Sequence, residues 1–193
     1  EFRRVLFRSV ANNIPVGTIQ VSSGAIMAGS SSFTIEINGK DSHGAFPHEG
    51  NDVILAASQI ALSISNLPAR KLDITRNPCI ISITNFHSGD GIINKIPSKA
   101  ILKGTIRAYE NIEKNIAPLI KNRLENLANA LEVEAKIEIK KGAPPTINNE
   151  ELYNKIVPNL KYFYTDVIII SNQKGMASED FAYYTQKYPS LYF

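Results

Sequence analysis

The sequence predicts an α/β fold built around a ferredoxin-like unit of order β-α-β-β-α-β, a four-stranded sheet with both helices on one face. Two observations predict it. Between Ser32 and Lys140, segments in which every second residue is apolar alternate with segments of helical period. Glycine and proline then break the pattern between residues 141 and 145. Shorter elements on both sides predict pieces of a second α/β domain.

The first half of this region predicts two strands joined by a helix. Residues 33–38 alternate apolar and polar side chains, as a half-buried strand does. A helix follows, with Asn51 or Asp52 as its N-cap. Its buried face consists of Val53, Ala57, Ile60 and Ile64. The apolar run from Cys79 to Thr84 predicts an interior strand.

The second half repeats the pattern in the order strand, helix, strand. Residues 100–109 alternate, with Leu102 and Ile106 on the apolar face. The apolar spacing then predicts a long helix over 112–131, and Pro118 predicts that this helix kinks or begins late. Residues 133–139 form the last strand, whose other face is charged.

The flanking segments carry their own elements. We expect a strand over 16–21, a hinge or linker over 28–32, a helix over 149–162, a strand over 167–170 and a helix opening at Ser178. The part beyond residue 144 has too few apolar residues to form a stable core alone. We therefore expect three regions, residues 10–30, 31–143 and 144–193.

Composition excludes several classes of function. The net charge is +3, and residues 1–9 supply +2 of it through three arginines and one glutamate, so no basic stripe for nucleic acid remains. No apolar run reaches the ~20 residues of a membrane span. Cys79 is the one cysteine, which excludes disulfides and cysteine metal sites and favours a reducing, cytoplasmic location.

Residues 1–9 have an unusual explanation. They lack the apolar stretch and cleavage site of a signal peptide. Back-translation of this segment yields a common sequencing-library adapter. We therefore expect that residues 1–9 are an assembly artefact, that native sequence begins at Val10, and that the chain is a fragment.

Five places could carry chemistry, and each also has a plain structural interpretation. His43 and His48 lie in a Gly/Pro-bounded loop, which is either a polar turn or part of a site; without a third ligand they predict no metal site. Asn94 is a turn residue or a donor to a carboxylate or an oxyanion. Arg107 is a solvated arginine or a planar fork for a carboxylate. His87 and the Ser178–Phe181 segment fit structural roles.

Together these places resemble a known family. The string from Gly39 to His48, the Asn94–Pro97 loop, the Gly104–Arg107 run and the Met176–Ala182 segment occur in the order found in the M20 metallopeptidases. Most similar is the amidohydrolase branch that includes hippurate hydrolase and the auxin-conjugate (IAA-amino acid) hydrolases. The resemblance covers residues 10–193.

The resemblance implies a catalytic domain interrupted by a lid domain. Residues 10–30 and 144–193 would be parts of the catalytic domain, the latter truncated, and 31–143 the lid or dimerisation domain. Such enzymes use two divalent metal ions, Zn or Mn, to cleave the amide bond of N-acyl amino acids or small peptides. By resemblance His43 is catalytic and stabilises the oxyanion, while Asn94 and Arg107 bind the substrate's free carboxylate. The lid forms a homodimer through its outer helix and edge strand, which would let His43 act across the dimer.

The metal ligands implied by the resemblance lie outside this chain. A histidine usually precedes the segment that begins at Val10, and Ser9 stands in its place. We therefore expect that this chain binds no catalytic metal and hydrolyses nothing. One alternative is a stand-alone ferredoxin-like module for dimerisation or binding, with no catalysis. An RNA-binding sheet of the same topology would need aromatic residues on its strands, which Ile80–Ile83 and Gly104–Ile106 do not supply.

Overall fold

A computed structural model of the chain describes residues 4–9, 14–163, 167–171 and 174–193. The chain forms two compact units. One comprises residues 31–142, and the other comprises residues 1–30 together with 143–193. We call them the sheet unit and the flanking unit. Each is described by itself below.

The sheet unit is built on a four-stranded sheet. Its strands in chain order are β4 (Gly29–Asn38), β6 (Cys79–Ser88), β8 (Lys99–Ala108) and β9 (Glu134–Lys141). In space the order is β6-β8-β4-β9, and β6/β8 and β4/β9 pair antiparallel. This order confirms the predicted ferredoxin-like topology. It also shows that the prediction of an interior position for the Cys79 strand was wrong, because β6 is an edge strand.

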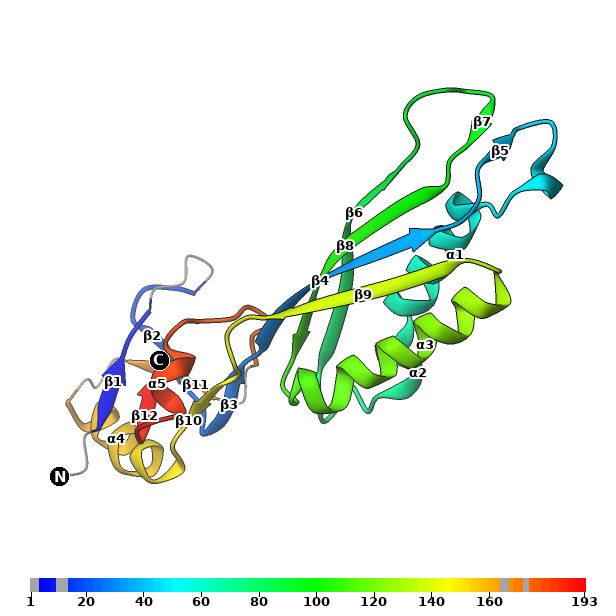
Figure 1. Cartoon of the computed structure of the whole chain (residues 1–193). Coiled ribbons are helices and arrows are strands. Elements are labelled where there is room, and N and C mark those ends of the chain that lie inside the picture. Colours follow the sequence, from blue (N-terminus) through cyan, green and yellow to red (C-terminus); the bar gives the residue numbers. More distant parts are fainter. Residues whose placement is uncertain (1–3, 10–13, 164–166, 172–173) are drawn as a thin grey trace. The chain divides into compact units, whose positions relative to one another are not determined.

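Three helices lie on one face of this sheet (Figure 1): α1 (Val53–Ser65), α2 (Leu67–Lys71) and α3 (Ala117–Ala130). Asp52 caps α1, since its carboxylate accepts hydrogen bonds from the backbone N–H groups of Ile54 (2.8 Å) and Leu55 (3.0 Å). A π-helical turn over residues 112–116 precedes α3, so that Pro118 falls in the first turn of α3, where its missing N–H costs no hydrogen bond. The predicted late start of this helix is confirmed.

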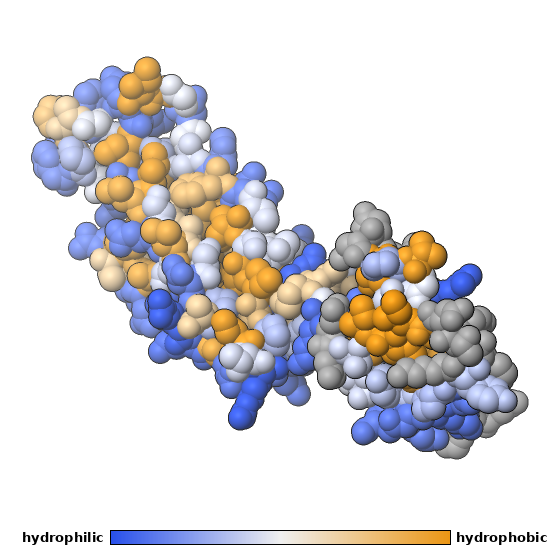
Figure 2. Space-filling view, turned by 180° about the vertical axis from the view of Figure 1, so that it is seen from behind, coloured by the Kyte–Doolittle hydropathy of each residue, from blue (hydrophilic) through white to orange (hydrophobic). Residues whose placement is uncertain are grey.

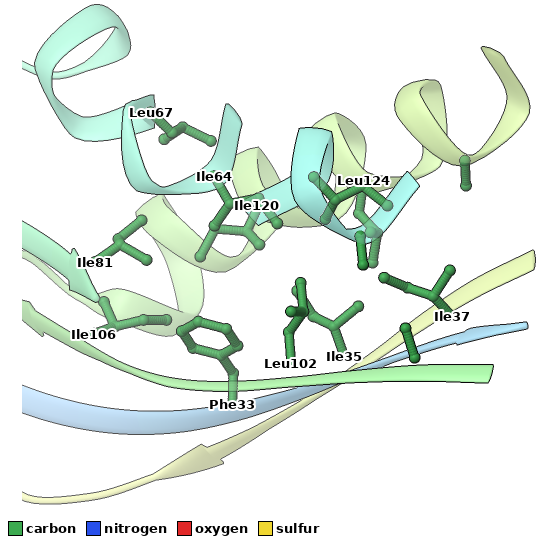
Figure 3. Packing of buried hydrophobic residues seen from close by; sticks show 14 of the residues in the cluster. Phe33, Ile35, Ile37, Ile64, Leu67, Ile81, Leu102, Ile106, Ile120 and Leu124 are labelled. Atoms are coloured by element: carbon green, nitrogen blue, oxygen red, sulfur yellow. The ribbon is translucent and has the colours of Figure 1, made fainter. Parts of the chain in front are cut away.

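The core of the sheet unit lies between the sheet and the helices. Figure 3 shows Phe33, Ile35, Leu102 and Ile106 pointing from the strands towards Ile64, Leu67, Ile120 and Leu124 of the helices. Ile35, Ile64, Leu102 and Ile120 are fully buried. Burial of such side chains stabilises the fold by about 1.5–3 kcal/mol each. Within the sheet unit, which the structure describes throughout, no helix covers the opposite face of the sheet, and this face carries polar side chains such as Thr34, Glu36 and Lys103.

The flanking unit is assembled from short strand pairs. They are β1 (Val5–Phe7) with β12 (Ser190–Tyr192) and β2 (Thr18–Gln20) with β11 (Ile168–Ile170), both parallel, and β3 (Gly24–Met27) with β10 (Thr146–Asn148), antiparallel. Helices α4 (Glu150–Phe163) and α5 (Ala182–Thr185) accompany them. The buried core of this unit is a small cluster: Val21, Leu152, Val157 and Leu191.

A buried asparagine holds the strands of the flanking unit together. The Nδ2 group of Asn148 donates to the carbonyl oxygens of Ser22 (2.8 Å) and Tyr192 (2.9 Å), and its Oδ1 accepts from the backbone N–H of Tyr192 (2.7 Å). Asn148 is 2% exposed, so these bonds replace the water that burial removes. Hydrogen bonding therefore supplements a core with few apolar residues.

One prediction for the flanking segments was wrong. The last helix does not open at Ser178, because α5 begins at Ala182. The stretch 28–32 contains the boundary between the two units, as a linker would, and β4 already begins within it at Gly29. The short strands β3 and β10 were not foreseen.

Gly104 on β8 supports a testable prediction about stability. A Cβ added here would collide with the Ser82 carbonyl oxygen and with the ring of Phe33, both of which are held by the sheet and its core. We expect Gly104→Ala to destabilise the sheet unit by about 1–3 kcal/mol, measured by urea unfolding. The matched control is Gly175→Ala, whose nearest neighbour would lie 3.8 Å away. Equal stability of the two variants would contradict the packing described here.

Candidate functional site

The loops at one end of the sheet unit are joined into a single structure, which we call the tip (residues 39–50 and 89–98). Strands β5 (Ser42–His43) and β7 (Lys95–Ile96) pair antiparallel there. Further backbone bonds extend this ladder: the N–H of Gly39 donates to the Ser98 carbonyl (2.9 Å), and the N–H of Gly44 donates to the Asn94 carbonyl (2.8 Å). The tip therefore holds together two segments about 50 residues apart in sequence.

The chain turns sharply at His43. The N–H of Phe46 donates to the His43 carbonyl (2.8 Å), which closes a β-turn, and the N–H of Ala45 donates to Nδ1 of the His43 ring (3.1 Å). The loop then folds back on itself at Gly50, where an added Cβ would lie 2.5 Å from the Lys40 carbonyl oxygen. Glycine is needed at position 50 for this close approach.

The structure brings two of the predicted site residues together. Nε2 of His43 lies 3.3 Å from Nδ2 of Asn94, across 51 residues of sequence. Both side chains are exposed and so are open to a ligand. The tip thus presents an imidazole and a carboxamide side by side, a combination suited to hydrogen bonding with a carbonyl or carboxylate oxygen.

Arg107 is placed elsewhere. Because Gly39 bonds to Ser98, the end of β4 lies beside the start of β8, and the tip adjoins that start. Arg107 lies eight residues beyond Lys99, roughly 26 Å along β8 at about 3.3 Å per residue. It pairs with Ile80 near the other end of β6. Within one chain, therefore, Arg107 does not form one site with His43 and Asn94.

The other candidate residues have local contacts. His48 lies in a 3-10 turn (Pro47–Glu49), with its ring edge-on to Phe46 at 6.3 Å between centroids, and His87 lies on β6 opposite Ile101. Glu179 accepts a hydrogen bond from the Tyr192 hydroxyl at 3.4 Å. Burial of the hydroxyl raises the pKa of Tyr192; a hydrogen bond with Ser9 opposes this rise, while the nearby charge of Glu179 and its hydrogen bond add to it.

Sequence reasoning missed an ion pair that stabilises the tip. Lys95 lies 3.3 Å from the Asp90 carboxylate, which also accepts a hydrogen bond from the Ile92 N–H (3.2 Å). The hydrogen bond from the Ile92 N–H is the largest cause that lowers the pKa of Asp90, and the hydrogen bond from Lys95 is the next largest. The Gly-Asp-Gly turn at 89–91 was the available signal, since an aspartate between glycines often bonds the backbone two residues on.

The implied metal ions have no matching ligand set here. Among the residues that the structure describes, no three His, Cys, Asp or Glu side chains come together as a metal site would require. We therefore derive no chemical step through a metal from this chain.

Among the residues that the structure describes, no helix combines the length and the apolar character that crossing a membrane demands.

Cys79 is buried at the start of β6. Burial, and next the nearby charge of Glu110, raise the pKa of its thiol to about 11. Only the thiolate form of cysteine acts as a nucleophile or a metal ligand, so the Cys79 thiol is unreactive in both roles.

Comparison with known proteins places the chain in a family. The family model for the M20 peptidase dimerisation domain matches residues 27–136, more than half of the chain. The chain belongs to the M20 family. The match covers most of the sheet unit, including its tip, and so includes His43, Asn94 and Arg107.

Relatives of known name extend the match beyond the dimerisation domain. The thermostable carboxypeptidase 2 of Saccharolobus solfataricus is 31% identical over 186 residues, which are 95% of this chain and 46% of that protein. N-acetyldiaminopimelate deacetylase of Brevibacillus brevis is 29% identical over 188 residues, covering 95% and 48%. This chain thus spans about half the length of the curated relatives it matches.

A solved structure shares the fold. A protein from Bacillus subtilis, described as a dinuclear metal-binding peptidase of the M20 family, superposes with a TM-score of 0.77 at 24% identity. The superposition covers 98% of this chain and 46% of that protein. The fold of both units is therefore that of an M20 protein.

The buried thiol leads to a prediction. Because its pKa is about 11 rather than 9.0, we expect Cys79 to react with a thiol reagent near pH 8 about 100-fold more slowly in the folded chain than in urea. The unfolded chain loses this proton first, so folding stability should fall as the pH rises from about 9 towards 11. Equal rates in the folded and unfolded chain would contradict the buried position.

Proposed function

We propose that the whole protein is a metal-dependent amidohydrolase that cleaves the amide bond of N-acyl amino acids or small peptides. The observation that carries this proposal is the extent of the match to relatives. It covers 95% of the chain, on both sides of the dimerisation domain, and the relatives are a carboxypeptidase and a deacetylase. Both names describe cleavage of an amide bond. A stand-alone dimerisation module, the alternative function, would not need the flanking unit.

The proposal includes two divalent metal ions, Zn or Mn, held by parts of the whole protein outside this chain. Support comes from the solved relative described as a dinuclear metal-binding peptidase. We also propose a cytoplasmic protein, in line with its one cysteine being an unpaired thiol. In this proposal residues 1–9 are an artefact of sequence assembly, even though Val5–Phe7 form strand β1 beside β12 in the structure.

The roles of the chain's own residues follow from the tip. We assign His43 as the catalytic group that donates a hydrogen bond to the oxygen of the scissile amide as negative charge develops there. Such a donor contributes roughly 10²–10³ in rate. The side chain of Asn94 contacts the His43 ring, and we propose that it binds the substrate beside that ring. Arg107, with its planar fork, would bind the free carboxylate of the substrate.

If Arg107 binds the same substrate as the tip, it must do so from a second chain, because the two lie far apart within one chain. The M20 family model is that of a dimerisation domain, and the sheet unit has two edges at which a dimer could form. On the β9 edge, charges of opposite sign alternate along the strand: Glu134, Lys136, Glu138 and Lys140. Charges of this kind discourage pairing between strands.

The β6 edge has the opposite character. Helix α1 packs beside β6, and together they expose large apolar side chains: Ile54, Leu55, Leu62, Ile80 and Phe86, each at least 42% exposed. Figure 2 shows apolar surface (orange) along the part of the molecule that contains the sheet unit. Exposed apolar surface next to an unpaired strand favours a partner. We therefore propose a homodimer in which two β6 strands pair about a two-fold axis.

This dimer completes the site. A two-fold axis through the β6 edge makes the paired strands antiparallel, so the Ser88 end of β6 lies beside the partner's Cys79 end. The tip follows directly after Ser88, and Arg107 pairs with Ile80 near the Cys79 end. The tip of one subunit is thereby brought towards the partner's Arg107. His43 and Asn94 would act on a substrate whose carboxylate the partner's Arg107 holds.

Arg107 has a test that separates binding from folding. In the complete enzyme, we expect Arg107→Ala to raise KM roughly 10- to 100-fold for substrates with a free carboxylate, because a charge-assisted bidentate bond is lost. KM for the corresponding amides should change little. Arg107→Lys is the control that keeps the charge without the fork. Equal effects on acids and amides would count against the assignment.

Action across the dimer can be tested with mixed dimers. His43→Ala and Arg107→Ala homodimers of the complete enzyme should both be impaired. Dimers mixed from the two variants contain one site with both wild-type residues, so they should recover up to about half of wild-type activity. If both residues acted within one chain, mixing would restore nothing.

The chain itself should be inactive. Incubation of the purified 193-residue chain with Mn²⁺ or Zn²⁺ and an N-acyl amino acid is expected to give no turnover, because we place the metal ligands outside it. Release of free amino acid, followed by a colorimetric assay, is the measurement. Turnover that depends on added metal would overturn this placement.

A further inference from the structure

Two short contacts define the chemical state of the His43 ring. Its Nδ1 lies 3.1 Å from the backbone nitrogen of Ala45, and its Nε2 lies 3.3 Å from the Nδ2 of Asn94. A neutral imidazole has one N–H donor and one acceptor nitrogen, and its neighbours decide which nitrogen carries the proton. An asparagine amide can turn either its oxygen or its nitrogen towards a neighbour.

The Ala45 contact has only one solution. A backbone N–H is always a donor, so Nδ1 of His43 must accept. The peptide group cannot turn away, because its neighbours are held: Gly44 N–H donates to the Asn94 carbonyl and Phe46 N–H to the His43 carbonyl, each at 2.8 Å. A proton on Nδ1 would place two N–H hydrogens between nitrogen atoms that are only 3.1 Å apart. The Nδ1–H tautomer of the neutral ring is therefore disfavoured.

The state of Nε2 follows. Since Nδ1 is the acceptor, Nε2 carries the proton, and a donor group of Asn94 facing it would leave two donors in contact. We infer that the Ala45 backbone holds His43 as the neutral Nε2–H tautomer, and that Asn94 turns its Oδ1 to accept this N–H. Ala45 and Asn94 are thus positioning residues for His43.

This inference deepens the proposed function and rests on it for its catalytic meaning. The Nε2–H group is fixed in direction before substrate binds, which is the preorganisation that stabilises a developing oxyanion. The substrate's carbonyl oxygen would replace the Asn94 oxygen as the acceptor. His43 then acts as a neutral hydrogen-bond donor, with no proton transferred to or from its ring.

Nitrogen NMR of the 193-residue chain tests the inference without any activity. Long-range ¹H–¹⁵N spectra, recorded at alkaline pH where the rings are neutral, distinguish protonated from unprotonated ring nitrogens. The His43→Gln variant assigns the signals. We expect His43 to show a protonated Nε2 and an unprotonated Nδ1, without averaging. His48 and His87 serve as internal controls, because neither ring has a hydrogen bond within the described residues, and both should show averaged tautomers.

Variants separate the two contacts. Asn94→Asp offers only acceptor oxygens, and Asn94→Ala offers nothing; both should keep the Nε2–H tautomer, because the Ala45 N–H remains. Ala45→Pro removes that N–H and should release His43 to averaged signals, whereas Ala45→Ser keeps the N–H and the single tautomer.

Several outcomes would overturn the inference. They are an Nδ1–H tautomer in the wild-type chain, averaged wild-type signals like those of His48, or a change of tautomer in Asn94→Ala. If Ala45→Pro disrupts the turn, the wild-type spectrum and the Asn94 variants still decide. A correct tautomer together with full activity of His43→Ala in the complete enzyme would refute the proposed function while leaving the inference intact.

Discussion

The pairing of residues 42–44 with residues 94–96 is the interaction on which the candidate site depends. The tip has little apolar burial: Phe46, Ile92 and Ile93 are all more than half exposed. Its shape comes instead from the β5–β7 ladder, the backbone bonds of Gly39 and Gly44, and the Asp90–Lys95 ion pair. Hydrogen bonds of this kind hold direction better than apolar contacts do. A side chain that must donate to one oxygen benefits from that property.

A second constraint is the length of the sheet. Eight residues of β8, Lys99 to Ile106, separate the tip from Arg107, and the rigid core between sheet and helices prevents the two from approaching each other. The proposed two-fold pairing at β6 would overcome this separation, because it would bring the tip of one subunit towards the opposite end of the partner's sheet. In this account the exposed apolar surface of α1 and β6 and the distant arginine have one explanation, the dimer.

The elements of the sheet unit could be predicted from sequence because each has a strong period. Residues 33–38 and 133–139 alternate, and Asp52 and Pro118 mark helix starts. The interior position given to the Cys79 strand failed for a physical reason. A continuous apolar run reports burial on both sides, and a partner subunit at an open edge would select for apolar residues as a neighbouring strand does. Strands of two to four residues, such as β3, β5, β7 and β10, are too short to show a period.

The site was accessible to sequence only residue by residue. Motifs singled out His43, Asn94 and Arg107, but nothing in their spacing indicates that the first two touch while the third lies far away. That separation depends on the register of β5 with β7 and on the direction of β8, which are long-range features. The roles of the Ala45 N–H and of the Asp90–Lys95 pair were likewise invisible, because a backbone donor leaves no mark in the sequence.

The pairing of β6 with the partner's β6 is the central claim, and cysteine cross-linking tests it most directly. In a Cys79→Ala background, chains carrying Ile80→Cys are mixed with chains carrying His87→Cys, which lie near opposite ends of β6. Antiparallel pairing about a two-fold axis predicts that the two kinds of chain cross-link to each other far more than either does to itself. Preferential cross-linking of Ile80→Cys chains to themselves, or no cross-link at β6 while Glu138→Cys chains on β9 form one, would contradict the account.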